Sequence, residues 1–405
     1  MTTLSAATAA GKITLLDHSE DYAAARVWAG VPLESADIAA LTARVKSGIA
    51  AQRLLFPDED TLVERIVVAA LSGHIVLTGP PGTGKTTLAG ILADAFDCTA
   101  TVETATAEWS SYDVIGGLSP KVVGTGDMAS EVLTPWLGHV SRAAVECADV
   151  IARHADDPNS EPHQGHWLIL DEFSRAEIDK AIGGLYTALG GGEQQIRLWF
   201  GDVPERQIVW LPKRFRLIGT MNSVDTAYVF SFSQGLTRRF QFIYVGVPDQ
   251  PQLSSEIKSA ALQAGAWYAA TYGGINPGDD AAVTAAAEVF EGSAQLQEVV
   301  PLLRSFVEFI RYPDPGNQRP GWPIGTAQIV DVMRQLRLRF GKGEAPLLNG
   351  LDLALADRVI PQMSGLLRDQ IEAIGARLGQ SDLKALVHTK RALTQLLDAQ
   401  NTQFS

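Results

Sequence analysis

Cysteine is nearly absent from this sequence, which has only Cys98 and Cys147 among its 405 residues. Two cysteines exclude a disulfide framework and a cysteine-rich metal site. Long apolar runs are also absent, because no stretch approaches the roughly 18 apolar residues that a membrane-spanning helix needs. The first residues have no basic segment followed by an apolar core, which is the pattern of a secretory signal. We therefore expect a cytoplasmic protein with no membrane insertion.

Positive charge is scarce relative to negative charge. The chain has 33 lysines and arginines against 46 aspartates and glutamates, which gives a formal net charge of −13. This balance argues against a protein that coats nucleic acid nonspecifically, although a local basic strip stays compatible with it. A hydrophobic content of 46% with 20% charged residues is typical of a globular protein with a real core. The length predicts two or three domains.

The sequence does contain a phosphate-binding motif. Residues 79–86 read G-P-P-G-T-G-K-T and fit the P-loop pattern G-x-x-x-x-G-K-[ST]. Before them, the apolar run at 74–78 predicts a buried strand, and after them residues 87–96 have apolar side chains at helical spacing. A strand, a glycine loop and a helix in this order are the context that the motif requires.

The residue types of this motif match the chemistry of a bound triphosphate. Gly82 and Gly84 let backbone N–H groups turn toward a phosphate, and the following helix points its positive end at the same anion. Lys85 is expected to reach the β- and γ-phosphates, and the Thr86 hydroxyl is expected to ligate Mg²⁺. The predicted nucleotide-binding residues of this stretch are Gly79, Pro80, Pro81, Gly82, Thr83, Gly84, Lys85, Thr86 and Thr87.

Two carboxylates follow a later apolar strand. Residues 167–170 read W-L-I-L and are followed by Asp171 and Glu172, which is the Walker B pattern. We expect Asp171 to lie beside the nucleotide as a second Mg²⁺ ligand, and Glu172 to polarise the attacking water. The next predicted strand, at 215–220, leads to Asn222, and the pair Arg238 and Arg239 precedes the last predicted strand at 241–245.

Periodicity and turn signals predict the remaining elements. Helices are expected at 35–45, at 134–152 with Thr134 as cap and Pro135 in the first turn, and at 178–190. Residues 196–200 and 207–211 alternate and predict a β-hairpin around Gly201 to Pro204. From residue 251 the pattern is helical, with helices expected at 251–271, 280–309, 325–340 and from 350 to 399, and a loop at 313–323.

Together these motifs resemble an AAA+ ATPase over roughly residues 50–400. Residues 170–176, L-D-E-F-S-R-A, are similar to the D-E-I-N-R-A signature of the MoxR and McrB branches, and residues 219–225 and 237–243 resemble the McrB-type motor. Residues 112–117 resemble the region where this branch carries an insertion in its second helix. The implied fold is α/β: a P-loop NTPase with an αβα parallel-sheet core and a C-terminal all-α lid. The implied domains are a helical extension at 1–50, the core at 51–248 and the lid at 249–405.

The resemblance also implies roles for the polar residues after the P-loop. Asn222 looks like the sensor-1 residue that orients the hydrolytic water. Arg238 and Arg239 look like the arginine-finger region that reaches the γ-phosphate held by a neighbouring subunit, and the sequence does not decide between the two. This arrangement implies a homo-oligomeric ring, with a hexamer as the expected size. Arg175 resembles an interface position, and the helix expected at 325–340 opens without the sensor-2 arginine of the family.

Several functions remain open at this point. The resemblance implies Mg²⁺-dependent ATP hydrolysis coupled to the remodelling of a protein partner, such as a protein with a von Willebrand A domain. The alternative is a McrB-like NTP-driven motor, with the choice between ATP and GTP open, within a nucleic-acid-translocating or defence complex that has a separate nuclease subunit. A nucleotide-gated scaffold is disfavoured because the catalytic polar residues are intact. Trp109 and Tyr112 either grip a threaded polymer or, as we expect, pack against the insertion.

Overall fold

The computed structural model describes residues 25–123, 130–190, 194–199, 208–222, 233–313, 320–344, 346–380 and 382–403. The chain divides into two compact units. Unit 1 contains the described residues up to Ala50, together with Asp60–Gly79 and Lys85–Val245, and unit 2 contains Ala51–Glu59, Pro80–Gly84 and the chain from Gly246 onward. The P-loop motif is therefore divided: its two ends belong to unit 1 and its five central residues to unit 2.

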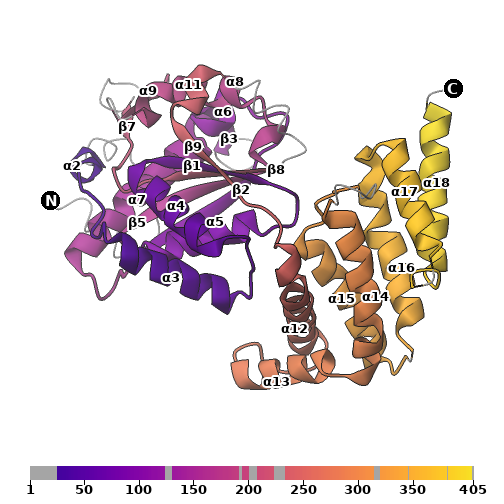
Figure 1. The fold of residues 1–405 in the computed structure, drawn as a ribbon. Coiled ribbons are helices and arrows are strands. Elements are labelled where there is room, and N and C mark those ends of the chain that lie inside the picture. Colours follow the sequence, from indigo (N-terminus) through magenta and orange to yellow (C-terminus); the bar gives the residue numbers. More distant parts are fainter. Residues whose placement is uncertain are drawn as a thin grey trace. The chain divides into compact units, whose positions relative to one another are not determined.

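A five-stranded parallel sheet forms the centre of unit 1 (Figure 1). Its strands are β1 (His74–Gly79), β2 (Cys98–Thr104), β5 (Gly165–Asp171), β8 (Leu217–Asn222) and β9 (Phe240–Tyr244), in the spatial order β2-β5-β8-β1-β9. The apolar runs of β1, β5 and β8 are buried, as expected for strands covered on both faces. Helices α5 (Lys85–Ala95) and α7 (His139–Asp156) pack against the sheet. The predicted parallel core is confirmed.

Parallel pairing brings three strand ends to one edge. Gly79 pairs with Asn222 at the ends of β1 and β8, and β5 ends at Asp171. At the opposite edge, His74 at the start of β1 pairs with Phe240 at the start of β9. The sheet thus separates the residues that follow β1, β5 and β8 from those that precede β9.

The helices around this sheet are mostly short. They are α2 (Ala25–Ala29), α3 (Ile38–Ala51), α4 (Glu59–Ser72), α6 (Ser111–Val114), η2 (Phe173–Arg175), α8 (Ile178–Ile182), η3 (Gly183–Leu185), α9 (Tyr186–Leu189) and α11 (Gln234–Thr237). The single helix predicted at 178–190 is therefore wrong, because two glycines begin a 3₁₀ turn in its middle. The predicted hairpin is confirmed as β6 (Gln195–Arg197) paired with β7 (Ile208–Trp210), and its tip lies outside the described residues.

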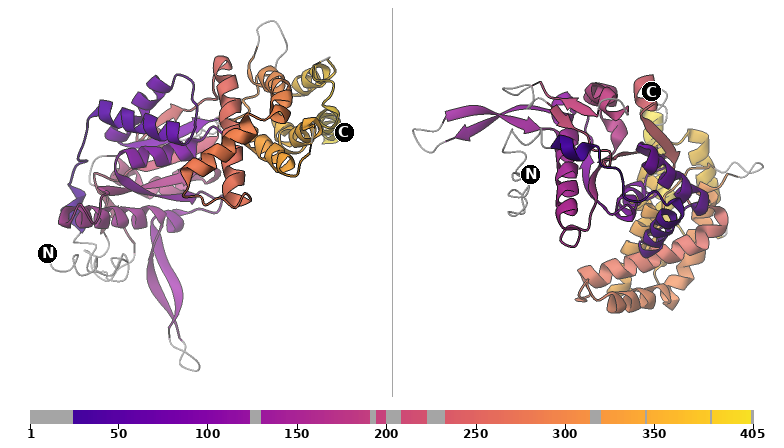
Figure 2. Two further views of the ribbon diagram at one scale, coloured as in Figure 1. Left: turned by 90° about the horizontal axis from the view of Figure 1, so that it is seen from below. Right: turned by 90° about the vertical axis from the view of Figure 1, so that its left-hand side faces the viewer.

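A long antiparallel hairpin projects from unit 1 (Figure 2). It consists of β3 (Gly116–Val123) and β4 (Ser130–Leu137). The helix predicted to begin at Thr134 is wrong for its first residues, since these pair with β3 and α7 begins only at His139. Short apolar spacing fits a strand as well as a helix, and here the pairing partner decided between them.

The aromatic residues at the base of this hairpin pack against each other. Trp109 is only 8% exposed and stacks on His139 with 4.8 Å between ring centroids. Tyr112 is 38% exposed and stacks on Trp136 at 5.1 Å. Trp109 is therefore packed, as the second interpretation requires, but its stacking partner is His139 at the start of α7.

Unit 2 is helical. Its elements are η6 (Gln250–Gln252), α12 (Leu253–Thr271), α13 (Asp280–Glu291), α14 (Ala294–Arg311), α15 (Thr326–Gly341), α16 (Leu348–Arg358), η7 (Ile360–Gly365), α17 (Arg368–Leu378) and α18 (Val387–Gln403). The predicted helix at 280–309 is two helices, because Ser293 caps α14 with its hydroxyl. Most of the loop predicted at 313–323 lies outside the described residues.

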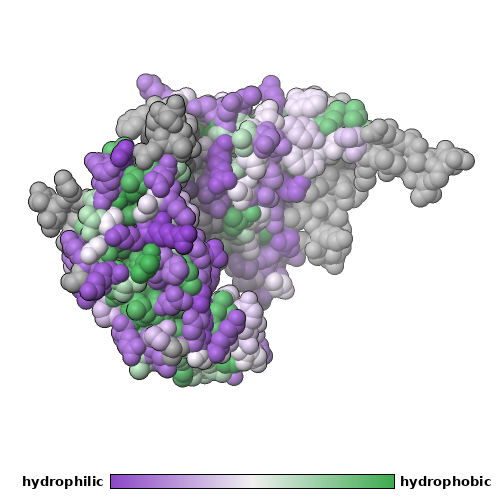
Figure 3. Space-filling view, turned by 90° about the vertical axis from the view of Figure 1, so that its right-hand side faces the viewer, coloured by the Kyte–Doolittle hydropathy of each residue, from purple (hydrophilic) through white to green (hydrophobic). Residues whose placement is uncertain are grey.

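The apolar residues of unit 2 are gathered in one interior cluster that draws on all the helices from α12 to α18. On the face shown in Figure 3, the hydrophobic residues of this unit form small patches separated by hydrophilic ones. Scattered patches of this kind are normal on a folded surface. Among the described helices, none is long and apolar enough to cross a membrane.

Candidate nucleotide-binding site

Lys85 lies at the centre of a polar cluster at the carboxyl edge of the sheet. It is the first residue of α5 and is 6% exposed. Its Nζ donates to the Gly79 carbonyl at 3.0 Å and to Asn222 Oδ1 at 3.2 Å. Burial lowers the pKa of Lys85 to about 8, although the nearby carboxylates of Glu172 and Asp171 act in the opposite direction. A phosphate would supply the anionic partner that this buried ammonium favours.

One carboxylate oxygen of Asp171 accepts hydrogen bonds from two hydroxyl groups. The Thr86 Oγ1 donates to Asp171 Oδ1 at 2.7 Å, and the Thr220 hydroxyl donates to the same oxygen. The sequence predicted Thr86 and Asp171 as neighbours, whereas Thr220 was named only as part of a strand. Thr220 lies two residues before Asn222 on β8, so the side chains of these two residues point to the same face of the sheet.

Glu172 follows Asp171 in an unusual backbone conformation. Its φ of 55° and ψ of 40° lie in the left-handed region, which is costly for a residue with a side chain. The carboxylate accepts from Asn222 Nδ2 at 3.2 and 3.1 Å and from Arg175 Nε at 3.3 Å. Asn222 therefore contacts both Lys85 and Glu172. The sequence predicted five residues of unit 1 at the reaction centre, and the structure brings them together: Lys85, Thr86, Asp171, Glu172 and Asn222.

The central residues of the P-loop form a tight turn within unit 2. Gly82 and Gly84 have φ values of +76° and +85°, a region that favours glycine. The Gly82 carbonyl accepts from the N–H of Ala327 at 2.9 Å, in the first turn of α15. A Cβ added to Gly325 would lie 2.3 Å from the Pro81 carbonyl oxygen, so the close contact of these two segments requires a glycine at position 325.

Gln328 is the residue at this contact that the sequence analysis missed. It is 7% exposed, and a Cβ added to Gly82 would lie 2.4 Å from its Oε1. Its Nε2 donates to Gln362 Oε1 at 2.9 Å, while its Oε1 has no hydrogen-bond partner in the described part of the chain. The first turn of α15 carries no arginine, and Gln328 is its third residue. The signal in the sequence is therefore the position of Gln328 at the start of this helix.

The two arginines do not belong to the polar cluster. They precede β9, at the amino edge of the sheet, and β1 advances roughly 17 Å between the two edges. Arg239 donates from Nη1 to the Gly235 carbonyl at 2.7 Å and from Nε to the Tyr186 carbonyl, and its guanidinium lies 5.1 Å from the Tyr186 ring centroid. Arg238 is exposed, and its side chain makes no hydrogen bond or ion pair with any described residue.

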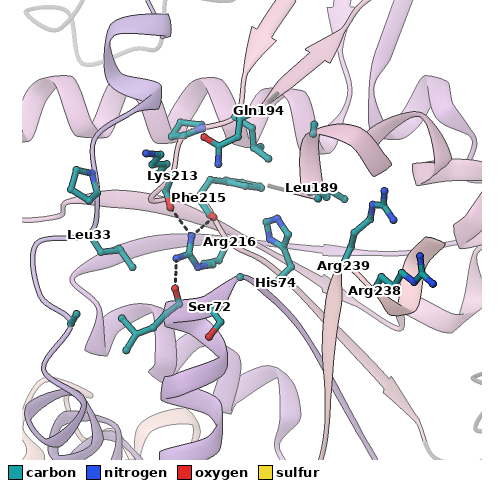
Figure 4. A pocket seen from close by; sticks show the side chains of 18 residues that line it. Leu33, Ser72, His74, Leu189, Gln194, Lys213, Phe215, Arg216, Arg238 and Arg239 are labelled. Carbon is teal, nitrogen blue, oxygen red and sulfur yellow. Dashed lines mark hydrogen bonds between the residues drawn. The ribbon is translucent and has the colours of Figure 1, made fainter. Parts of the chain in front are cut away.

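Both arginines line a cavity of about 620 Å³ within unit 1 (Figure 4). Lys213 and Arg216 also line this cavity, and none of its described lining residues is acidic. The Arg216 guanidinium is occupied by backbone carbonyls, including that of Lys213 at 2.7 Å. In a chain with a net charge of −13, this edge of the sheet is locally cationic.

Comparison with known proteins agrees with this geometry. Residues 74–240 match the family model described as AAA domain (dynein-related subfamily). No curated protein matches the chain. Among solved structures, two mutant forms of RuvB from Thermotoga maritima share 15% identity, cover 85% of this chain and 89% or 88% of their own, and have TM-scores of 0.37 and 0.40. These likenesses are too low to transfer any property of RuvB.

The family match spans β1 to β9 and therefore contains the P-loop, both carboxylates, Asn222 and the two arginines. Its bounds are the first residue of β1 and the first residue of β9, so most of β9 and the helical C-terminal part of the chain lie outside the match. Residues 74–240 of this chain therefore match an AAA domain of the dynein-related subfamily.

Proposed function

We propose that this chain is an ATPase that assembles into a ring, a hexamer in the simplest arrangement, and couples Mg²⁺-dependent ATP hydrolysis to the remodelling of a protein partner in the cytoplasm. The observation that supports hydrolysis is the contact of Asn222 with both Lys85 and Glu172. Holding a phosphate requires the P-loop alone. Hydrolysis also requires a group that orients water and a base that takes its proton.

The proposed roles follow from the cluster. The P-loop backbone and Lys85 hold the β- and γ-phosphates, Asn222 orients the attacking water and Glu172 accepts its proton. The strained backbone at Glu172 keeps its carboxylate beside Asn222. Thr87 follows the motif in the first turn of α5, where its backbone N–H is available to a phosphate.

The oxygens around Asp171 fit Mg²⁺. The ion is usually bound by one or two protein oxygens together with phosphate oxygens and water. The Thr86 hydroxyl and one Asp171 oxygen lie 2.7 Å apart and supply this donor set. Among the described residues no group of three or more His, Cys, Asp or Glu side chains offers a competing metal site. Bound there, Mg²⁺ would neutralise charge on the transferring phosphate.

We further propose that Arg238, and not Arg239, is the arginine finger. Arg238 is at the amino edge of the sheet, so its guanidinium is a whole strand length from Lys85 and Asp171 of the same chain. Its guanidinium makes no hydrogen bond or ion pair with a described residue, whereas that of Arg239 donates to two backbone carbonyls. A finger in this place serves a nucleotide held by a second copy, which is the reason to propose a ring.

Replacing Glu172 tests the hydrolysis proposal. We expect Glu172→Gln to bind ATP as the wild type does and to lower kcat at least about 100-fold, since the base is lost while the phosphate contacts stay. Nucleotide affinity is measured with a fluorescent ATP analogue and turnover by phosphate release. Glu177→Gln is the matched control, because that carboxylate is exposed and, among the described residues, forms an ion pair with Lys180 alone. Normal turnover in Glu172→Gln would remove Glu172 from the reaction.

Replacing Arg238 tests the ring proposal. Arg238→Ala should lower kcat roughly 1,000-fold or more without changing ATP affinity, as loss of a finger does. Light scattering with ATP should show an oligomer, and turnover per chain should fall on dilution below the assembly concentration. A monomer with full turnover would contradict the proposal.

A protein partner, such as one with a von Willebrand A domain, is supported by the acidic net charge and by the MoxR-like signature at 170–176. The alternative, a McrB-like motor in a nucleic-acid complex with a separate nuclease, rests on the resemblance of residues 219–225 and 237–243. Stimulation of hydrolysis by DNA would favour that alternative. Comparing turnover of ATP with that of GTP decides the base preference.

A further inference from the structure

The segment that carries Arg238 is too short to hold its own orientation. Helix α11 (Gln234–Thr237) is one turn long, and Arg238 is its C-cap residue. Ser233 caps the other end, where its hydroxyl accepts from the Leu236 N–H at 3.2 Å. A single turn is not stable alone, so the direction of Arg238 depends on what anchors the segment 233–239.

Asp179 anchors the beginning of this segment. Its Oδ2 accepts from the Ser233 N–H at 2.9 Å, and its Oδ1 accepts from the hydroxyls of Ser233 and Tyr186. Burial acts to raise the pKa of Asp179, yet these donors outweigh it and the pKa is lowered. Burial and the bond to Asp179 raise the pKa of Tyr186 to about 12, so the phenol stays a donor at neutral pH. The carboxylate is therefore charged and accepts three hydrogen bonds.

Tyr186 anchors the end of the segment. Its carbonyl accepts from Arg239 Nε, and its ring lies under the Arg239 guanidinium. Its hydroxyl is the one bound to Asp179. Asp179 and Tyr186 thus hold residues 233 and 239 together, while the side chain of Arg238 between them has no described partner.

Asp179 also lies on the route from the reaction centre. It is the second residue of α8, seven positions after Glu172, and the two are joined through η2. Phe173 and Ile178 of this route are buried. The stretch of chain from Glu172 to Asp179, which contacts the segment 233–239, is therefore short and held by buried side chains.

We propose that Asp179 is a positioning residue for Arg238: it fixes the segment 233–239 so that the Arg238 guanidinium is aimed at the triphosphate held by a second copy of this chain. This rests on the proposed function, in which Arg238 acts in trans. Asp179 itself touches no nucleotide. Displacement of a catalytic group by about 1 Å costs about 100-fold in rate, so loss of the anchor should be visible in kcat.

The first experiment compares Asp179→Asn, Arg238→Ala and the double variant. Asparagine keeps the size of the side chain but turns an NH₂ group toward the Ser233 donors. We expect Asp179→Asn to lower kcat about 100-fold, with KM and ATP affinity unchanged, and the double variant to be no slower than Arg238→Ala. Asp157→Asn is the matched control with wild-type activity, because Asp157 likewise accepts from a serine hydroxyl and a backbone N–H. If the fold reduction of kcat in the double variant equalled the product of the two single-variant reductions, the inference would be overturned.

The second experiment separates a displaced finger from a damaged fold. Glu172→Gln chains cannot hydrolyse but keep their finger, and Asp179→Asn chains keep an intact hydrolytic cluster. Mixing the two variants should restore turnover at those interfaces where the Arg238 of a Glu172→Gln chain reaches the nucleotide held by an Asp179→Asn chain. The role of Asp179 would be overturned if this mixture did not recover turnover while a mixture of Arg238→Ala with Glu172→Gln chains did. Full activity of Arg238→Ala alone would instead overturn the finger, and with it the proposed ring mechanism.

Discussion

The buried ion pair of unit 2 allows a quantitative test of its stability. Glu256 and Arg311 both have side chains at 0% exposure, and both guanidinium nitrogens Nη1 and Nη2 donate to the carboxylate. The Thr326 hydroxyl donates to Glu256 Oε1 at 2.6 Å, so the pair supports the residue that begins α15. Burial acts to lower the pKa of Arg311, but Glu256 raises it overall, so the arginine stays charged.

Glu256→Gln removes the negative charge and leaves the shape almost unchanged. Removing one partner of a buried pair leaves the other charge without compensation, which destabilises by about 3–5 kcal/mol. For a unit of this size, 1 kcal/mol corresponds to about 2–4 °C, so the melting temperature of unit 2 should fall by roughly 10 °C. The measurement is thermal unfolding followed by the fluorescence of Trp267 and Trp322, which lie in unit 2.

Two further variants bound this expectation. Replacing both partners, Glu256→Leu with Arg311→Met, should be neutral or stabilising by about 1–4 kcal/mol, because no charge is left to desolvate. Glu372→Gln removes half of an exposed pair with Arg368 and should change stability by less than about 1 kcal/mol. A shift for Glu256→Gln as small as that for Glu372→Gln would refute the reasoning.

Three other predictions follow from single sites. Because the pKa of Lys85 is lowered to about 8 and phosphate favours the charged form, ATP affinity measured by calorimetry should fall as pH rises above about 8, by up to about tenfold per unit. Gly325→Ala should weaken ATP binding severalfold, since its Cβ would meet Pro81, whereas Gly365→Ala, which meets nothing within 4 Å, should not. Burial raises the pKa of Cys147 to about 12, so a thiol reagent should label it only after unfolding.

The contiguous motifs could be predicted because their chemistry needs only neighbouring residues. A P-loop needs glycines at fixed offsets and a lysine at the helix start, and Asp171 with Glu172 needs only a buried strand before it. These requirements are local, so strands β1, β5 and β8 and the polar residues at their ends were found from the sequence. Parallel pairing then brings such ends to one edge.

Short apolar segments could not be assigned in the same way. Residues 130–137 have a spacing compatible with a helix, and only their pairing with β3 makes them a strand. Residues 178–190 are interrupted at two glycines whose effect depends on what surrounds them. In the first case the neighbouring strand of the hairpin decides, and in the second the chain turns at its own glycines.

The sequence by itself predicted a P-loop for a nucleotide, and it named the lysine, hydroxyl, carboxylates and amide that we propose act on the triphosphate. The tertiary structure alone distinguished Arg238 from Arg239, because the carbonyls of Tyr186 and Gly235 bind the Arg239 guanidinium, while no described residue binds that of Arg238. It alone placed Gln328 against Gly82, some 246 residues earlier in the chain, and Asp179 beneath Ser233. Motifs specify which groups a site contains, whereas their directions depend on contacts that no local pattern encodes.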